Sequence, residues 1–125
     1  MKQTICLVED NADNRLLVHA ILDDLYDVIE YCDGASALEG LKIVHPDVLL
    51  LDISLPEMDG TEVLARLRQD PEIRALPVIA LTAHAMAGDR ARFLDIGFDE
   101  YVSKPIADEE LLLSAITRCV APVAR

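Results

Sequence analysis

Short runs of apolar, β-forming residues alternate along the chain with segments in which apolar residues recur every three or four positions. The central run, Val48-Leu49-Leu50-Leu51-Asp52, is typical of a strand buried on both faces of a parallel sheet. Further strands are predicted at residues 4–8, 28–32, 78–82 and 100–102. The central run ends on a carboxylate, which is costly to bury without a partner, so Asp52 is the first candidate for chemistry.

A helix is predicted after each strand, and its apolar residues predict which face it buries. These residues are Leu17, Ala20, Ile21 and Leu25 in the first helix, Ala37, Leu38, Leu41 and Val44 in the second, Val63, Leu64 and Leu67 in the third, and Leu111, Leu112, Ala115, Ile116 and Cys119 in the last. The fourth helix is predicted over residues 85–96, before the cap residue Gly97, and the last over 108–119.

Five alternations of strand and helix predict an α/β fold in which helices cover both faces of a parallel sheet. Right-handed crossovers leave few topologies. We expect a flavodoxin-like, doubly wound, five-stranded parallel sheet with five helices and strand order 2-1-3-4-5, one of the two common solutions. The length predicts a single domain spanning residues 1–125.

The net charge of −12 narrows the range of partners. It argues against nucleic acid, whose binding needs clustered lysine and arginine, and against anionic membranes. Divalent cations and basic patches on other proteins are more favourable partners for a strongly negative protein. No apolar run is long enough to span a membrane. Cys6, Cys32 and Cys119 are widely separated, so we expect them to be reduced and buried. Both observations lead us to expect a cytoplasmic protein.

Polar side chains follow four of the predicted strands at the point where each strand ends. Glu9 and Asp10 follow the first strand, Asp52 and Thr82 end the third and fourth, and Lys104 follows the fifth. In the expected topology these five side chains share one crevice. Three close carboxylates repel one another, and a bound cation offsets this repulsion. Oxygen ligands favour Mg²⁺. A hydroxyl and an ammonium group can both donate hydrogen bonds to a phosphoryl group. The residues therefore predict an aspartate nucleophile beside a magnesium site.

The motifs around these residues resemble the receiver domain of two-component response regulators over essentially the whole chain. The matching segments are Val8-Glu9-Asp10-Asn11, Leu51-Asp52-Ile53-Ser54-Leu55-Pro56-Glu57-Met58-Asp59-Gly60, Leu81-Thr82-Ala83 and Tyr101-Val102-Ser103-Lys104-Pro105-Ile106. The resemblance implies a signalling switch rather than a turnover enzyme. It also implies that Asp52 takes a phosphoryl group from a phosphohistidine on a histidine kinase or a histidine phosphotransfer protein.

The same resemblance assigns Mg²⁺ or Mn²⁺ to Asp10, Asp52 and the backbone carbonyl of Ser54, with Glu9 acting through a water. Lys104 and the hydroxyl of Thr82 would contact the phosphoryl oxygens, as would the backbone amide of Ala83. Movement of Thr82 would allow Tyr101 to turn inward and reset the surface of the fourth helix, fifth strand and fifth helix, which contacts a downstream protein. The protein would be a monomer or a phosphorylation-dependent dimer.

Several alternatives stay open. The chain could be a stand-alone regulator, which the closeness of Met1 to the first strand slightly favours, or a receiver excised from a hybrid kinase. A phosphorylation-independent pseudo-receiver is a third possibility. A dehalogenase-like phosphohydrolase would need an acid where Ser54 stands.

The remaining polar residues singled out by the sequence are read as follows. His84 is either a proton shuttle or an exposed loop residue, and His19 and His45 are predicted at the surface. Asn11 and Asn14-Arg15 form either part of a docking face for the phosphodonor or a helix cap with an exposed arginine.

Overall fold

The computed structural model describes residues 3–83, 89–104, 106 and 109–120. Five parallel strands form one sheet in the order β2-β1-β3-β4-β5, which is the predicted order. The strands are β1 (Gln3–Val8), β2 (Tyr26–Tyr31), β3 (Val48–Asp52), β4 (Val78–Thr82) and β5 (Glu100–Ser103). The helices are α1 (Ala12–Leu22), α2 (Gly34–Val44), α3 (Gly60–Arg68), α4 (Asp89–Ile96) and α5 (Glu109–Cys119).

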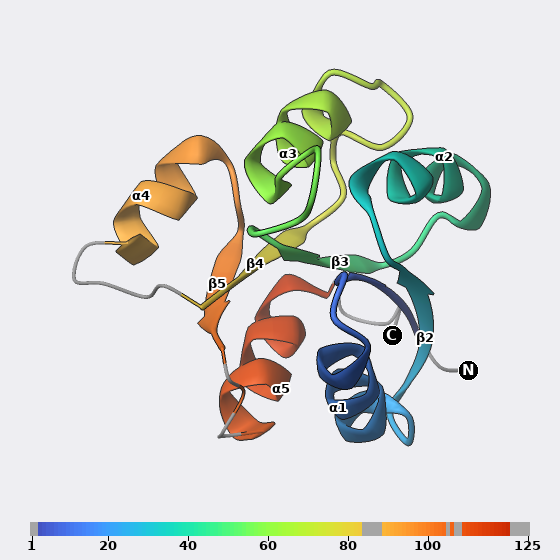
Figure 1. Ribbon diagram of the computed structural model, residues 1–125, viewed down its shortest axis with the longest axis vertical. Coiled ribbons are helices and arrows are strands. Elements are labelled where there is room, and N and C mark those ends of the chain that lie inside the picture. The colour runs from blue at the N-terminus through green and yellow to red at the C-terminus, as the bar shows by residue number, and fades with distance from the viewer. Residues whose placement is uncertain (1–2, 84–88, 105, 107–108, 121–125) are drawn as a thin grey trace, which may run out of the picture.

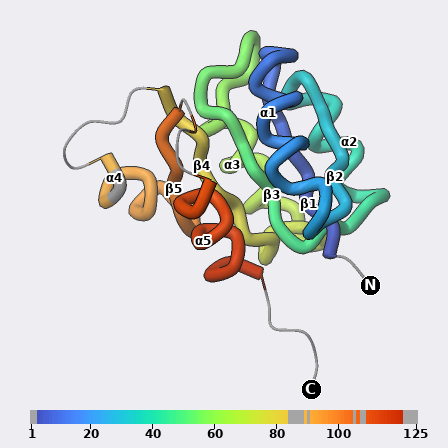
Figure 2. The backbone as a smooth tube through the Cα atoms, turned by 90° about the horizontal axis from the view of Figure 1, so that it is seen from below, coloured from blue at the N-terminus to red at the C-terminus, as the bar shows by residue number. Residues whose placement is uncertain are grey.

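The helices form two layers, one on each face of the sheet. Helices α2, α3 and α4 lie on one face, and α1 and α5 lie on the other (Figure 1). Figure 2, turned by 90°, shows α1 and α5 in front of the sheet. Each layer covers its own apolar core because neighbouring strand residues point to opposite faces: Leu49 and Leu51 join the first core, whereas Leu50 joins the second.

The first three helices begin at polar capping residues. The side chains of Asn11, Asp33 and Asp59 accept hydrogen bonds from the backbone N–H groups three residues further on. Each bond satisfies a donor that the first helical turn leaves without an internal partner. These short-range bonds fix where the chain turns from each strand into its helix.

The predicted buried face of α1 is wrong except at Ile21, which is partly buried against the second core. Leu17 and Leu25 are 42% and 54% exposed, and Ala20 is exposed as well, whereas Val18 and Leu22 are buried. Apolar residues surround most of this helix, so periodicity alone does not select a face, and the side chains that contact the sheet are one position further along. Leu25 lies beyond the end of the helix at Leu22.

Two further residues predicted to be buried are exposed, and a third, Cys119, is only partly buried. Leu111 is 62% exposed because α5 packs on the sheet through Leu112, Ala115 and Ile116. Cys32 is exposed because it lies just beyond the end of the edge strand β2. Cys6 is buried as predicted, and burial raises the pKa of its thiol to about 12.

The fourth helix is described only from Asp89, and the predicted residues 85–88 lie outside the described part of the chain. Gly97 has the positive φ of 128° expected at a helix C-terminus. None of the described helices has the length and apolar character needed to cross a membrane.

Candidate functional site

The ends of four neighbouring strands bring the predicted site residues to one edge of the sheet. Hydrogen bonds beyond the paired strands hold them there: Ile53 N–H donates to the carbonyl of Leu81 over 3.0 Å, and Lys104 N–H donates to that of Thr82 over 2.7 Å. The backbone of β3 and β5 is therefore fixed relative to β4 at the residues that carry the candidate chemistry.

Glu9, Asp10 and Asp52 form an acidic cluster. One carboxylate oxygen of each lies within 4.8 Å of one from each of the others, and Glu9 and Asp52 are buried while Asp10 is exposed. Oxygen donors from carboxylates are the ligands that Mg²⁺ accepts, with waters completing its shell. The cluster therefore fits a hard divalent cation that is reached from the solvent side.

Lys104 compensates the two buried acids. Its Nζ lies 3.0 Å from Oε1 of Glu9 and 3.0 Å from Oδ2 of Asp52. Burial by itself lowers the pKa of Lys104, but the hydrogen bonds that its ammonium group donates to the two carboxylates outweigh burial, and the net direction is upward. Lys104 therefore stays charged, and it provides a cation at the place where an anionic group would sit beside Asp52.

The carboxylate of Glu9 is held in an unusual environment. Burial raises its pKa, and the neighbouring Asp52 adds to that direction, while Lys104 and the backbone N–H of Asn11 act against it. A like charge beside a buried carboxylate favours the protonated form, and a bound cation would relieve both effects. Ionising Glu9 beside Asp52 is therefore unfavourable without a ligand, and a bound cation would remove that cost.

The loop after β3 folds closely over Asp52. Ser54 N–H donates to Oδ1 of Asp52 over 3.0 Å, and Gly60 N–H donates to the carbonyl of Ile53 over 2.9 Å. A Cβ on Gly60 would lie 2.5 Å from the carbonyl oxygen of Asp52, so this position accepts only glycine without a shift of the backbone.

The remaining predicted residues that the structure describes lie at the end of β4, just after it, and on β5. Thr82 is 4% exposed at the end of β4, and Ala83 follows it at the surface. Tyr101 is half-buried, and its ring centroid lies 5.8 Å from that of Phe93 on α4. His84 lies outside the described residues.

Sequence reasoning missed the contacts of Arg15 and His19. Arg15 is not an exposed residue of the helix start, since its Nη1 donates to the carbonyl of Glu9 over 2.7 Å. His19 lies at the surface as predicted, with 38% of its side chain exposed, and its Nδ1 lies 2.7 Å from Oε2 of Glu30. His45 is exposed as well, as predicted. A contact to a backbone carbonyl leaves no signature in the residue pattern, and the approach of Glu30 depends on how α1 lies against β2.

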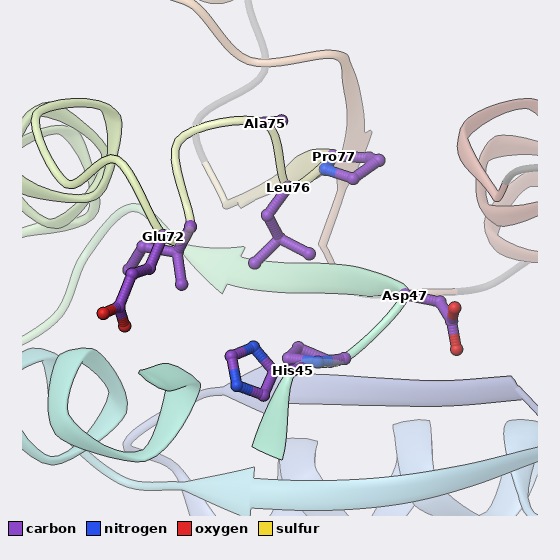
Figure 3. A pocket seen from close by; sticks show the side chains of 8 residues that line it. His45, Asp47, Glu72, Ala75, Leu76 and Pro77 are labelled. Atoms are coloured by element: carbon purple, nitrogen blue, oxygen red, sulfur yellow. The ribbon is translucent and has the colours of Figure 1, made fainter. Parts of the chain in front are cut away.

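A hollow of about 270 Å³ lies at the opposite edge of the sheet, before β3 and β4 (Figure 3). Its lining residues are His45, Pro46, Asp47, Glu72, Ile73, Ala75, Leu76 and Pro77. Figure 3 shows the carboxylates of Asp47 and Glu72 at opposite ends of it, and Asp47 also accepts a hydrogen bond from Thr4 N–H. The polar groups therefore do not converge, in contrast to those of the acidic cluster.

Comparisons with known proteins identify the family of this chain. The family model for the response regulator receiver domain matches residues 5–116. The polar-differentiation response regulator DivK of Brucella abortus (strain 2308) is 42% identical over 108 residues, which are 86% of this chain and 88% of DivK. The signal transduction histidine-protein kinase BarA of Escherichia coli (strain K12) is 40% identical over 112 residues, which are 89% of this chain but 12% of BarA.

Solved structures agree with these relatives. The receiver domain of the sensor histidine kinase PA1611 from Pseudomonas aeruginosa PAO1, with a magnesium ion in its active-site cleft, is 35% identical, and the match covers 95% of this chain and 98% of that one with a TM-score of 0.85. The chemotaxis response regulator CheY4 of Vibrio cholerae is 25% identical, with 96% and 100% covered and a TM-score of 0.86.

Proposed function

The chain belongs to the response regulator receiver domain family, whose members are phosphoryl-accepting signalling switches, and we propose that Asp52 is the acceptor in this chain. The observation that carries the proposal is the position of Asp52 at the end of the central strand. Its carboxylate is buried there among Glu9, Asp10 and the ammonium group of Lys104. Receiver domains are switches rather than turnover enzymes, so the aspartyl phosphate itself is the signal.

In the proposed step, a carboxylate oxygen of Asp52 attacks the phosphorus of a phosphohistidine on the partner. The new P–O bond forms as the P–N bond breaks, and the imidazole leaves with the electron pair of that bond. Lys104 already lies 3.0 Å from Oδ2 of Asp52, and its charge stabilises the phosphoryl oxygens. The hydroxyl of Thr82 and the backbone amide of Ala83 would donate hydrogen bonds to the other phosphoryl oxygens.

Asp10, Asp52 and the backbone carbonyl of Ser54 would hold Mg²⁺, and Glu9 would act through a water. When bound, the ion neutralises negative charge that gathers as the phosphoryl group approaches the acids. Within this chain, the acids orient the ion, while the N–H of Ser54 fixes Oδ1 of Asp52 by a 3.0 Å hydrogen bond.

The output of the switch would pass through Thr82 and Tyr101. Thr82 moves toward the phosphoryl group, and Tyr101, which is half-buried against Phe93, turns into the space that Thr82 leaves. That change resets the surface formed by α4, β5 and α5, which binds a downstream protein. Two arrangements of one packed element suffice for this response.

The phosphoryl donor would be a histidine kinase or a histidine phosphotransfer protein, acting in the cytoplasm. DivK, which the chain matches over most of its length, suggests a single-domain regulator of residues 1–125. BarA, of which the chain spans 12%, suggests a receiver within a hybrid kinase. A pseudo-receiver that binds without phosphorylation is less consistent with the compensated Asp52–Lys104 pair.

Intact mass after incubation with an acyl phosphate tests the proposal. We expect one added phosphoryl group in the presence of Mg²⁺, little when the metal is chelated, and none in Asp52→Asn. Asp47→Asn is the matched control, because Asp47 lies at the opposite edge of the sheet, and it should gain the group normally. A phosphoryl group on Asp52→Asn would contradict the assignment, and no gain with any donor would favour the pseudo-receiver.

A further inference from the structure

We infer that Arg15 is a positioning residue for the cation site, because it holds the peptide that joins Glu9 to Asp10. The inference rests on the proposed function, since Asp10 is one of the proposed Mg²⁺ ligands. Nη1 of Arg15 donates a 2.7 Å hydrogen bond to the carbonyl oxygen of Glu9. Because the peptide unit is planar, a bond to this carbonyl also fixes the orientation of the amide of Asp10.

Glu9 is held at several of its polar groups. Its N–H donates to the carbonyl of Tyr31 over 3.0 Å, and its carboxylate accepts from Asn11 N–H over 3.2 Å and from Lys104 over 3.0 Å. The bond from Arg15 fixes the remaining polar group, which is the carbonyl. Asp10 follows directly and is exposed, so the direction of this backbone decides where its carboxylate points.

Arg15 is itself held in place on two sides. Its backbone N–H donates to the carbonyl of Asn11 in the first turn of α1, and its Nε lies 3.6 Å from Oε1 of Glu30 on β2. The other carboxylate oxygen of Glu30 lies 2.7 Å from Nδ1 of His19. The guanidinium, whose side chain is 23% exposed, therefore links the turn after β1 to the edge strand. A planar guanidinium with several donors suits such a link, since it can serve two partners at once.

The sign of a charge effect separates positioning from electrostatics. A cation close to the acids repels Mg²⁺, so if Arg15 acted through its charge alone, its removal would tighten Mg²⁺ binding. If Arg15 positions Asp10, its removal weakens binding in spite of the lost repulsion. The direction of the change in affinity therefore identifies the role.

A Mg²⁺ titration followed by backbone amide chemical shifts tests the inference in the full chain. In Arg15→Met, which lacks both the donors and the charge, we expect the affinity to fall by about tenfold, the low end for residues that orient a ligand. Arg15→Lys keeps one donor within reach of the carbonyl and should recover most of the loss. Arg66→Met is the matched control, because Arg66 forms an exposed ion pair with Glu62 on α3, and it should bind as the wild type does.

Phosphorylation provides a second readout that a general loss of stability would not reproduce. For Arg15→Met, we expect a higher Mg²⁺ concentration at half-maximal phosphorylation and an unchanged rate at saturating Mg²⁺. Arg15→Gln, whose shorter side chain does not span the same distance, replaces Arg15→Met if that variant does not fold. Equal or tighter binding in either variant overturns the inference alone, whereas a wild type that binds no Mg²⁺ overturns the proposed cation site with it.

Discussion

The ammonium nitrogen of Lys104 lies 3.0 Å from Oδ2 of Asp52, although Asp52 ends β3 and Lys104 follows β5, far away in the sequence. The same nitrogen lies 3.0 Å from Oε1 of Glu9. The side chains of Glu9 and Asp52 are 1% and 2% exposed, so one partly buried cation compensates two almost completely buried anions. A metal ion or a phosphoryl group would change this balance, which is how ligand binding can alter the local structure.

Removal of Lys104 should destabilise the protein when Mg²⁺ is absent. In Lys104→Met, the two buried carboxylates lose their cation, and we expect the free energy of unfolding to fall by about 3 kcal/mol. Added Mg²⁺ should restore part of the loss, because the ion replaces the missing charge. Chemical denaturation with and without Mg²⁺ measures both effects.

Lys42→Met is the control for this experiment. Lys42 also lies 3.0 Å from a carboxylate, that of Asp70, but it is 54% exposed, and its removal should change stability little. Equal stability of Lys104→Met and the wild type without Mg²⁺ would show that Lys104 does not compensate the acids.

The variant Lys104→Ala tests the signalling role of the same residue. We expect it to retain part of its phosphorylation, while its activation of a downstream partner is reduced.

Mg²⁺ binding should depend on pH through Glu9. Because burial raises the pKa of Glu9 above its ordinary value of 4.5, the folded protein keeps this proton to a higher pH than the unfolded chain does. The contribution of Glu9 to stability is therefore greatest at low pH and declines as pH rises from 4.5 through the raised value. Mg²⁺ competes with the proton, so its affinity should rise over the same pH range.

Titrations of Mg²⁺ at several pH values between pH 4.5 and neutrality check this prediction. The variant Glu9→Gln cannot titrate, and it should lose the part of the pH dependence that the wild type shows above 4.5. Identical pH profiles for the two proteins would mean that Glu9 does not control the protonation of the site.

Gly60 should tolerate no side chain, because the obstacle beside it is the backbone at the end of β3. A Cβ would lie 2.5 Å from the carbonyl oxygen of Asp52 and 2.8 Å from Cα of Ile53. We expect Gly60→Ala to lose about 2 kcal/mol of stability and to bind Mg²⁺ more weakly, since Asp52 must shift.

Gly34→Ala provides the comparison for Gly60→Ala. Its Cβ would also lie at 2.5 Å, but from a side-chain atom of Val63, which can move without displacing an acid. Gly34→Ala should therefore leave the Mg²⁺ affinity unchanged even if it lowers stability. Denaturation and Mg²⁺ titration of both variants separate the two effects, and an unperturbed site in Gly60→Ala would argue against tight packing over Asp52.

The aromatic pair on α4 and β5 should report the switch. Tyr101 lies 5.8 Å from Phe93, centroid to centroid, so the ring current of Phe93 acts on it. With fluorotyrosine incorporated at the three tyrosines of the chain, we expect phosphorylation to move the fluorine NMR signal of Tyr101, assigned with Tyr101→Phe. The signal of Tyr26, on the far edge strand, should stay in place.

Thr82→Ala tests whether Thr82 transmits the change to Tyr101. The variant should still gain the phosphoryl group, as judged by intact mass, while the Tyr101 signal keeps its unphosphorylated position. A Tyr101 signal that moves as much in Thr82→Ala as in the wild type would remove Thr82 from the switch.

The sequence by itself determined that five strands alternate with five helices, and which strand ends carry the polar side chains. Runs such as residues 48–52 and 78–82 are predicted at the observed boundaries, because continuous apolar stretches between turn residues have one favourable environment, the interior of a parallel sheet. Handedness and alternation reduced the possible strand orders to a few, and the structure has the one that we expected. The meeting of Glu9, Asp10 and Asp52 then followed from the topology alone. The chemical roles of these residues remain predictions.

Only the tertiary structure decided which face of a helix is buried and which long side chains contact the backbone. Periodicity allowed α1 to bury Leu17 or Val18, and contact with the sheet selected Val18. The bond from Arg15 to the carbonyl of Glu9 depends on the angle at which α1 leaves the turn after β1, and the backbone atom that it contacts is the same in every residue type. Local patterns encode local geometry, whereas such contacts depend on the packing of whole elements, which no short stretch of sequence specifies.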